Sequence, residues 1–419
     1  MRPYQGYVYA YPHKTAYRPL TPQPTLTDVW AHEDKQALFL YLHVPFCEVR
    51  CGFCNLFTRT GATQDLTTAY LDALSRQADA TREALGDARF AMAAFGGGTP
   101  TYFSAPELER LCDIADRFAT GVPLGVETSP DTATKDRLTV LRDRGTTRIS
   151  IGVQSFVEAE ARAAVRPQKP RQAREALDTI REVGFRTLNI DLIYGIDGQT
   201  PQSWIQSIDA ALDWRPEELY LYPLYVRPLT GLGRLAGDWD DQRLALYRLG
   251  REHLLARGYE QVSMRMFRLP GPGGGTEYCC QEDGMVGLGC GARSYTSALH
   301  YSFDYAVRAS EVRQIIDDYV ESEDFGTARV GFALDDAERR RRHLVQSLLQ
   351  VSGLDRVAYR SRFGTDVLAD FELGPVEEFL VGDTGTLRLT DEGLAHSDAI
   401  GPMLFSPGVQ SLMDAYEAR

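Results

Sequence analysis

The stretch Tyr41-Leu-His-Val-Pro-Phe-Cys-Glu-Val-Arg-Cys-Gly-Phe-Cys-Asn55 carries three cysteines, Cys47, Cys51 and Cys54, in a C-x3-C-x2-C spacing. Three thiolates from one short loop can bind three irons of a [4Fe–4S] cube and leave the fourth iron without a protein ligand. S-adenosylmethionine (SAM) can chelate such an open iron through its amino and carboxylate groups, and an electron from the cluster then breaks the sulfonium bond. The spacing therefore predicts chemistry that starts from a 5′-deoxyadenosyl radical.

A zinc knuckle is the alternative interpretation of this loop. Structural zinc usually takes four Cys or His ligands, and His43 is the only local candidate for the fourth. The apolar run Leu38–Leu42 before the cysteines is typical of a buried strand. The cysteines then follow its carboxyl end, where α/β barrels place their chemistry, and this position favours the cluster.

Short apolar strands alternate with amphipathic helices from residue 37 to about residue 226. The predicted strands cover residues 38–44, 90–95, 124–127, 148–153, 187–194 and 219–225, and the predicted helices cover residues 66–85, 105–118, 132–144, 171–183 and 201–214. Six βα units in series imply a parallel sheet with right-handed crossovers. We therefore predict an α/β fold built on an open (β/α)6 partial TIM-type barrel, whose lateral gap could admit a bulky substrate.

Polar residues follow several of these strands. The turn Gly96-Gly-Gly-Thr-Pro100 would let the backbone approach a ligand where a Cβ would clash, although many such turns serve packing only. Glu127, Gln154 and Asp191 each lie at the end of a successive strand. One acid at such a place could simply cap a helix. Three polar side chains at the cluster-bearing face suit a ligand with hydroxyl and ammonium groups, as SAM is.

The composition indicates a large enzyme rather than a nucleic-acid-binding or membrane protein. The chain has 419 residues, and its 45 Lys+Arg against 58 Asp+Glu give a net charge of −13. This charge disfavours sequence-independent binding to nucleic-acid backbones. It contains no run of eighteen apolar residues and begins without a signal-like apolar segment. Its seven cysteines fit a reducing compartment, so we expect a cytoplasmic location.

The aromatic N-terminal segment is unusual. Its tyrosines are Tyr4, Tyr7, Tyr9, Tyr11 and Tyr17. Residues 7, 9 and 11 alternate with a period suited to one face of an extended strand, and several prolines exclude a long helix. With His13 and Lys14, the segment could form a lid for a planar or acidic ligand, or it could brace a sheet edge.

Several segments resemble the radical SAM proteins of the oxygen-independent coproporphyrinogen III oxidase family. The resemblance covers nearly all of the chain after residue 37. It rests on residues 41–54, 95–101, 126–130, 148–156, 188–200, 221–229, 258–264 and 286–294. It implies an N-terminal arm or lid at residues 1–36, a radical SAM core at 37–230, a bridge at 231–334 and a small helical, winged-helix-like domain at 335–419.

The resemblance also implies a role for individual residues. Cys47, Cys51 and Cys54 would ligate the cluster. The residues that would contact SAM are Tyr41, Gly97, Gly98, Thr99, Glu127, Gln154, Arg166 and Asp191. Among them Arg166 would meet the carboxylate of the cofactor and Asp191 its ribose, although an ordinary surface arginine is the alternative for Arg166.

Two departures from the family's pattern bear on the reaction. The oxidases carry another cysteine soon after the third ligand, where this chain has Asn55, and the haem chaperones carry a Cys-Arg-His-Asn stretch where it reads Tyr278-Cys-Cys-Gln-Glu-Asp283. We therefore rank methyl or one-carbon transfer with two SAM molecules first, ahead of decarboxylation with one. A haem-binding chaperone without turnover is the third alternative.

The ligands outside the cluster loop follow from these alternatives. A second SAM would lie near Met264-Arg-Met-Phe267, which could also be an ordinary strand. We expect a small-molecule or peptide substrate and an electron donor such as a flavodoxin or ferredoxin, and neither nucleic acid nor a membrane as partner. Cys279, Cys280 and Cys290 could hold a second cluster or deliver a hydrogen atom, but burial as small residues is favoured, as it is for Cys112.

Overall fold

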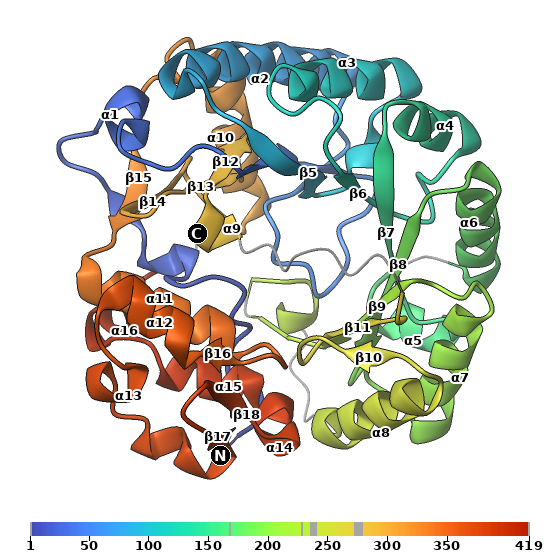
Figure 1. Ribbon diagram of the computed structural model, residues 1–419. Coiled ribbons are helices and arrows are strands. Elements are labelled where there is room, and N and C mark those ends of the chain that lie inside the picture. Colours follow the sequence, from blue (N-terminus) through green and yellow to red (C-terminus); the bar gives the residue numbers. More distant parts are fainter. Residues whose placement is uncertain (1, 167–168, 228, 235–240, 272–279, 418–419) are drawn as a thin grey trace.

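The computed structural model describes all residues except 1, 167–168, 228, 235–240, 272–279 and 418–419. Its centre is a sheet in which six parallel strands follow one another in chain order (Figure 1). They are β2 (Leu38–Val44), β5 (Phe90–Gly97), β6 (Leu124–Thr128), β7 (Thr146–Gln154), β8 (Thr187–Tyr194) and β9 (Glu218–Pro223). These strands match the predicted ones, and the partial-barrel fold is confirmed.

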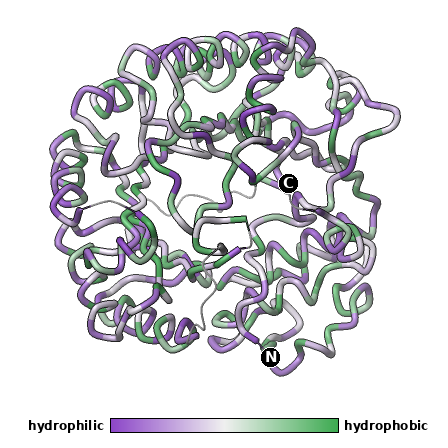
Figure 2. The backbone as a smooth tube through the Cα atoms, turned by 180° about the vertical axis from the view of Figure 1, so that it is seen from behind, coloured by the Kyte–Doolittle hydropathy of each residue, from purple (hydrophilic) through white to green (hydrophobic). Residues whose placement is uncertain are grey.

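Helices cover the outer side of this sheet (Figure 1). They are α2 (Gln64–Leu85), α3 (Ala105–Asp116), α4 (Lys135–Asp143), α6 (Pro170–Val183), α7 (Pro201–Leu212) and α8 (Arg243–Ala256). Along them hydrophilic and hydrophobic positions alternate (Figure 2). α6 shows why the local sequence forms a helix: Pro170 opens it, Gly184 ends it in the left-handed conformation, and its buried face includes Leu177 and Ile180. The short helix α5 (Glu158–Ala163) was not predicted.

Further strands extend the sheet at both edges. β12 (Met285–Leu288) lies parallel to β2, and antiparallel strands continue outward from it: β13 (Arg293–Tyr295), β14 (Leu299–Ser302), β15 (Val330–Ala333) and β1 (Arg18–Pro19). At the other edge, β11 (Met266–Arg268) and β10 (Glu260–Gln261) follow β9. Across the described residues β1 and β10 remain as edges, so the barrel stays open.

The C-terminal elements surround a second apolar core. They are α11 (Asp336–Leu348), α12 (Arg356–Phe363), α13 (Val367–Asp370), α14 (Asp391–Ala395), α15 (Ser397–Met403), α16 (Pro407–Asp414) and a sheet of β16 (Leu354–Asp355), β18 (Thr386–Leu389) and β17 (Leu380–Gly382). Tyr11 and Ala16 from the N-terminal segment are fully buried in this core. The N-terminus accordingly lies beside the C-terminal elements (Figure 1).

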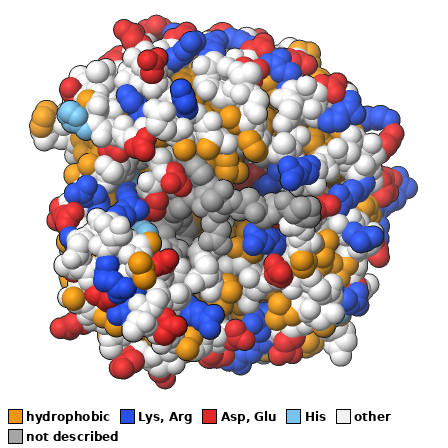
Figure 3. Space-filling model, viewed as in Figure 1, with side chains coloured by type: hydrophobic (Ala, Val, Ile, Leu, Met, Phe, Trp, Pro, Cys, Tyr) orange, Lys and Arg blue, Asp and Glu red, His pale blue; other side chains and the backbone are white. Residues whose placement is uncertain are grey.

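The surface visible in Figure 3 carries charges of both signs. Lys, Arg, Asp and Glu side chains are interspersed over the face seen in Figure 3, without a continuous basic surface there. Among the described residues, no helix combines the length and the apolar character that a membrane crossing requires.

Candidate functional site

A pocket of about 830 Å³ lies at the carboxyl ends of the parallel strands. Ten of the predicted site residues line it: Cys47, Cys51, Cys54, Gly97, Gly98, Thr99, Glu127, Gln154, Arg166 and Asp191. We call the part of the pocket that these residues line the cluster side. The structure thus brings them together around one cavity, while their individual contacts with a cofactor stay predictions.

The cluster loop carries its three thiols into the pocket wall. Thr99 Oγ1 lies 3.5 Å from Cys47 Sγ, and Arg166 Nη1 donates a hydrogen bond of 3.3 Å to Cys51 Sγ. Burial raises the pKa of Cys47 to about 12 and also raises the pKa of Cys54. Thiols in this environment hold their protons until a metal binds, so loading with iron would release protons.

The three thiols do not form the convergent set that a single metal ion requires. Within the part of the chain that the structure describes, no three His, Cys, Asp or Glu side chains converge on one metal ion. Each thiolate of a cubane cluster binds a different iron, so the sulfurs need not converge on one point. The donor set therefore fits a [4Fe–4S] cluster.

The glycine turn after β5 packs directly against the cluster loop. Gly97 has a φ of +108°, and a Cβ there would lie 2.4 Å from the ring of His43. A Cβ on Gly98 would lie 2.6 Å from the carbonyl oxygen of Phe46. Because a side chain would clash at both positions, the turn needs glycine to lie this close to the loop.

Two carboxyl groups on the cluster side, those of Glu127 and Asp191, interact electrostatically. Glu127 Oε2 accepts a hydrogen bond of 3.1 Å from the Gly97 amide, and Asp191 Oδ1 accepts one of 2.7 Å from Asn189 Nδ2. Burial is the main cause that raises the pKa of Glu127 to about 7 and that of Asp191 to about 6, and Asp191 adds to the rise at Glu127. A cationic ligand would relieve both effects, and SAM carries a sulfonium and an ammonium group.

Gln154 and Arg166 complete the cluster side. Gln154 has a φ of +71°, a strained conformation of the kind that functional sites often retain. Arg166 Nη2 donates a hydrogen bond of 2.6 Å to the carbonyl of Gly152, while Nη1 contacts Cys51. Arg166 therefore faces the pocket and is not a surface arginine, and its contact with the SAM carboxylate stays a prediction.

Tyr41 does not line the pocket. Its hydroxyl lies 3.3 Å from His43 Nδ1, and His43 Nε2 lies 3.2 Å from the carbonyl oxygen of Phe57. Burial lowers the pKa of His43 to about 4. Both ring nitrogens of His43 thus have partners within the protein, which leaves neither for the zinc site considered above.

A second set of residues lines the same pocket and was not predicted as a set. We call it the arm side, and it consists of Tyr7, Tyr9, His13, Lys14, Arg227, Arg293 and Tyr305. The segment that contains Tyr7, Tyr9, His13 and Lys14 was predicted to be a lid or a brace. Nothing in the sequence singles out Arg227, Arg293 or Tyr305 as pocket residues. The suggested strand is wrong, because residues 7–11 form no strand: Tyr7 and Tyr9 face the pocket whereas Tyr11 is buried in the second core. The segment thus serves as a wall and as a brace.

The two sides of the pocket meet at the cluster loop. Lys14 Nζ lies 3.4 Å from the centroid of the Tyr305 ring, and the Tyr305 hydroxyl donates a hydrogen bond of 2.6 Å to the carbonyl of Asn55. Asn55 directly follows Cys54. A ligand bound on the arm side would therefore lie next to the cluster loop.

The segment Met264–Phe267 does not reach the pocket, so its predicted role as the wall of a second SAM site is wrong. Arg265 is buried and forms an ion pair of 2.5 Å with Asp398 of α15. Met264 and Phe267 are also buried. The charge of the Arg265 guanidinium is therefore already neutralised within the protein.

No other cysteine among the described residues lines the pocket. Cys290 is fully buried and Cys112 is 2% exposed, as expected for small core residues. Cys280 lies partly exposed in α9 (Cys280–Asp283), and Cys279 lies outside the described residues.

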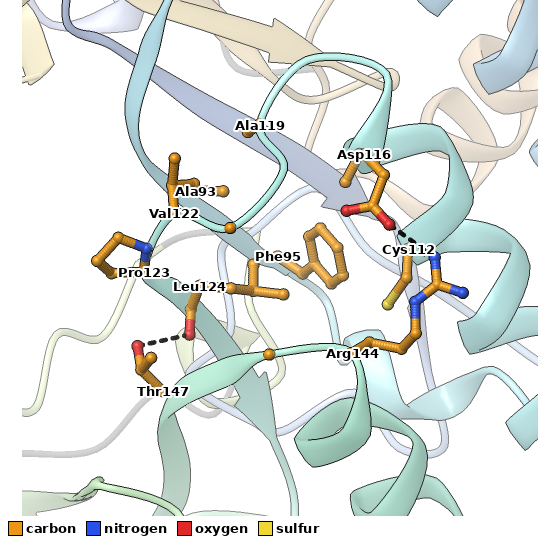
Figure 4. A pocket seen from close by; sticks show the side chains of 13 residues that line it. Ala93, Phe95, Cys112, Asp116, Ala119, Val122, Pro123, Leu124, Arg144 and Thr147 are labelled. Atoms are coloured by element: carbon orange, nitrogen blue, oxygen red, sulfur yellow. Dashed lines mark hydrogen bonds and ion pairs between the residues drawn. The ribbon is translucent and has the colours of Figure 1, made fainter.

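Cys112 borders a smaller cavity of about 230 Å³ at the opposite ends of β5 and β6 (Figure 4). Arg144 borders it too and is paired there with Glu109, Asp113 and Asp116. Since this charge is already neutralised, the cavity presents no cation that a ligand could use.

Known proteins resemble this chain in sequence and in fold. Residues 41–211 match the Radical SAM superfamily. The oxygen-independent coproporphyrinogen III oxidase of Pseudomonas aeruginosa is 29% identical over 390 residues, covering 85% of this chain and 81% of that protein. The heme chaperone HemW of Bacillus subtilis is 29% identical over 267 residues, covering 61% of this chain and 70% of that protein. The solved structure of coproporphyrinogen III oxidase (HemN) from Escherichia coli superimposes with a TM-score of 0.80 at 24% identity, covering 96% of this chain and 97% of that one, which establishes the fold.

Proposed function

Because this chain is a radical SAM enzyme homologous to oxygen-independent coproporphyrinogen III oxidases, we propose that it removes a hydrogen atom from a carboxylated substrate held on the arm side of the pocket. The observation that carries the proposal is the single cavity in which three thiols, two carboxylates and a wall of tyrosines and cations lie together. The cluster side supplies the radical and the arm side supplies the place for a flat, anionic molecule.

The radical SAM domain implies a [4Fe–4S] cluster and SAM, which together supply a 5′-deoxyadenosyl radical when bound. Cys47, Cys51 and Cys54 would hold the cluster. Glu127 and Asp191 would orient the cationic cofactor, and their negative charge would be stabilised by it. The aromatic wall would shield the radical from solvent on the arm side.

Oxidative decarboxylation is the reaction that we propose. Loss of CO₂ from a substrate radical leaves one electron, which a separate one-electron acceptor must take. Transfer of a carbon unit from a second SAM, which ranked first in the sequence analysis, gains no support from the related proteins, and the segment expected to hold that second SAM does not line the pocket.

The cluster also requires an electron from a donor, and we propose a flavodoxin or ferredoxin. The cluster loop exposes Val49 and Leu56, which are 38% and 48% exposed. Such apolar side chains beside the cysteines offer a contact for a donor that must approach closely.

The test uses the reconstituted, reduced protein with SAM and coproporphyrinogen III. We expect one 5′-deoxyadenosine for each CO₂ released, and no label in the product when the SAM carries a deuterated methyl group. Deuterium in the product would instead establish one-carbon transfer. Stoichiometric haem binding without any 5′-deoxyadenosine would establish the chaperone function and refute an enzyme.

A further inference from the structure

Three cations on the arm side come from three separate parts of the chain. Lys14 lies in the 3-10 helix η1 (Lys14–Ala16), Arg227 follows β9, and Arg293 begins β13. All three line the pocket. We call them the cation trio.

The side chains of the cation trio contact tyrosines rather than carboxylates. Lys14 lies over the ring of Tyr305, as described above, and the Arg227 guanidinium lies 5.4 Å from the centroid of the Tyr225 ring. Arg293 Nη1 donates a hydrogen bond of 2.7 Å to the hydroxyl of Tyr9. Among the described residues, no ion pair joins a member of the trio to a carboxylate.

The three charges are close enough to repel each other. Burial lowers the pKa of Lys14 well below its usual value, and the positive charges of Arg293 and Arg227 lower it further. Burial also lowers the pKa of His13, and Lys14 and the same two guanidinium groups lower it further. Holding like charges together out of water costs free energy, unless an anion joins them.

Several buried or partly buried arginines elsewhere in the molecule are paired with an acid of the protein itself. Arg265 is paired with Asp398, Arg342 with Glu282 at 3.3 Å, and Arg148 with Glu218 at 2.7 Å. The pocket lining does include Asp414, which the C-terminal helix contributes, but it forms no ion pair with the trio among the residues described. The missing counter-charge at the trio therefore points to a ligand.

We propose that Lys14, Arg227 and Arg293 form a receptor for carboxylate groups of the substrate, with Tyr9 and Tyr305 packed against its apolar frame. The inference rests on the proposed function, because it names the residues that select the substrate at that site. Phosphate sites typically use convergent backbone amides at a helix N-terminus. The trio offers separated side chains from three walls, which suits a molecule with more than one carboxylate.

A binding experiment tests this receptor without requiring turnover. Full-length protein is titrated with coproporphyrin III, a fluorescent tetracarboxylate, and with its uncharged tetramethyl ester. Lys14→Met, Arg227→Gln and Arg293→Gln should each raise the Kd for the tetracarboxylate about tenfold or more, since each removes a charge-assisted contact. Lys14→Arg should keep most of the affinity, and Arg181→Gln, which affects a half-buried arginine paired with Glu217 on the outside of the barrel, should match the wild type.

Three outcomes would overturn the receptor. The ester could bind as tightly as the acid, the trio variants could bind like the wild type, or pyrophosphate could displace the porphyrin at lower concentration than benzenetricarboxylate does. Thermal melting of each variant identifies one that fails to fold. If Arg293→Gln unfolds, Lys14→Met provides the test instead. Charge-dependent binding by a protein that releases no CO₂ from coproporphyrinogen III would support the receptor and refute the proposed reaction.

Discussion

The cluster side and the arm side of the pocket are built in opposite ways. The residues of the cluster side lie in the parallel strands or in the segments that connect one of these strands to the next, so their places are set by local sequence and by the barrel. The arm side joins the N-terminal segment, the residues after β9 and strand β13, which lies at the extended edge of the sheet. Short sequence motifs determine the position of the cluster side, whereas the position of the arm side depends on the whole fold.

This difference explains how each side is held in place. On the cluster side, hydrogen bonds such as that from the Gly97 amide to Glu127 join neighbouring strand ends. The arm is fixed by contacts over long sequence distances. The amides of Gln5 and Gly6 donate to the carbonyl of Asp398, and the ring of Tyr7 lies 3.8 Å from the guanidinium carbon of Arg265. Substitutions far from the pocket should therefore be able to displace the residues of the arm side.

The largest effect is expected from Cys51→Ala, which should break the cluster side alone. Removal of one thiolate should abolish the absorbance of the [4Fe–4S] cluster near 400 nm and the cleavage of SAM together, because thiolate ligation holds the iron. Binding of coproporphyrin III should remain. Iron analysis and 5′-deoxyadenosine assays measure the first effect, and a variant that kept four irons and activity would contradict the ligand assignment.

Asp398→Asn should break the arm side and spare the cluster. It leaves the buried Arg265 without its counter-charge and weakens the bond of 2.5 Å that Asp398 accepts from the hydroxyl of Tyr225. Breaking a buried ion pair costs roughly 3–5 kcal/mol. Urea unfolding should show this loss, whereas Asp391→Asn, which affects a largely exposed partner of Arg251, should change stability by less than about 0.5 kcal/mol.

Asp191→Ala should weaken SAM binding while iron content stays intact. Loss of a charge-assisted hydrogen bond to the cofactor costs roughly 1.5–3 kcal/mol, which raises the Kd about 10- to 100-fold. Calorimetry measures the affinity, and Asp197→Ala, at an exposed position that does not line the pocket, is the control. An unchanged affinity would show that the role implied for Asp191 is wrong.

Glu127→Gln should have the smallest effect, a change in how stability depends on pH. The pKa of Glu127 is raised from 4.5 to about 7 in the folded protein without ligands, so the folded state binds more protons than the unfolded state between these values. Stability therefore falls as pH rises through this window. The Glu127→Gln variant lacks this titration. Its free energy of unfolding, measured relative to that of the wild type, should therefore be about 1 kcal/mol higher at pH 8 than at pH 4, after allowance for solvent in the open pocket. Equal curves at both pH values would contradict the pKa shift.

The parts of the fold that could be predicted are those with a local signal. The six parallel strands are apolar runs followed by amphipathic helices, and each shows its own period. Strands β12 to β15 are short and pair with segments far away in sequence, so nothing near Met285 or Leu299 reveals their partners. The N-terminal strand β1 pairs with β15 for reasons that only the folded chain contains.

The same limit applies to the site. The cluster residues could be found because thiolates, glycines and acids recur at strand ends. Arg227 and Arg293 look like ordinary charged residues in sequence, because their meaning comes from the absence of a nearby acid in three dimensions. Met264–Phe267 shows the opposite error: a guanidinium beside apolar residues looked like a ligand site, but its partner Asp398 lies in a distant helix.

The C-terminal residues Met413, Asp414 and Tyr416 line the pocket together with Tyr7 and Lys14 from the other end of the chain. These segments are far apart in sequence, so the wall that they share can form only after long-range contacts have formed. The cluster loop depends on contacts that are mostly local. A partly folded chain would therefore expose its three thiols while this wall of the substrate chamber is still open.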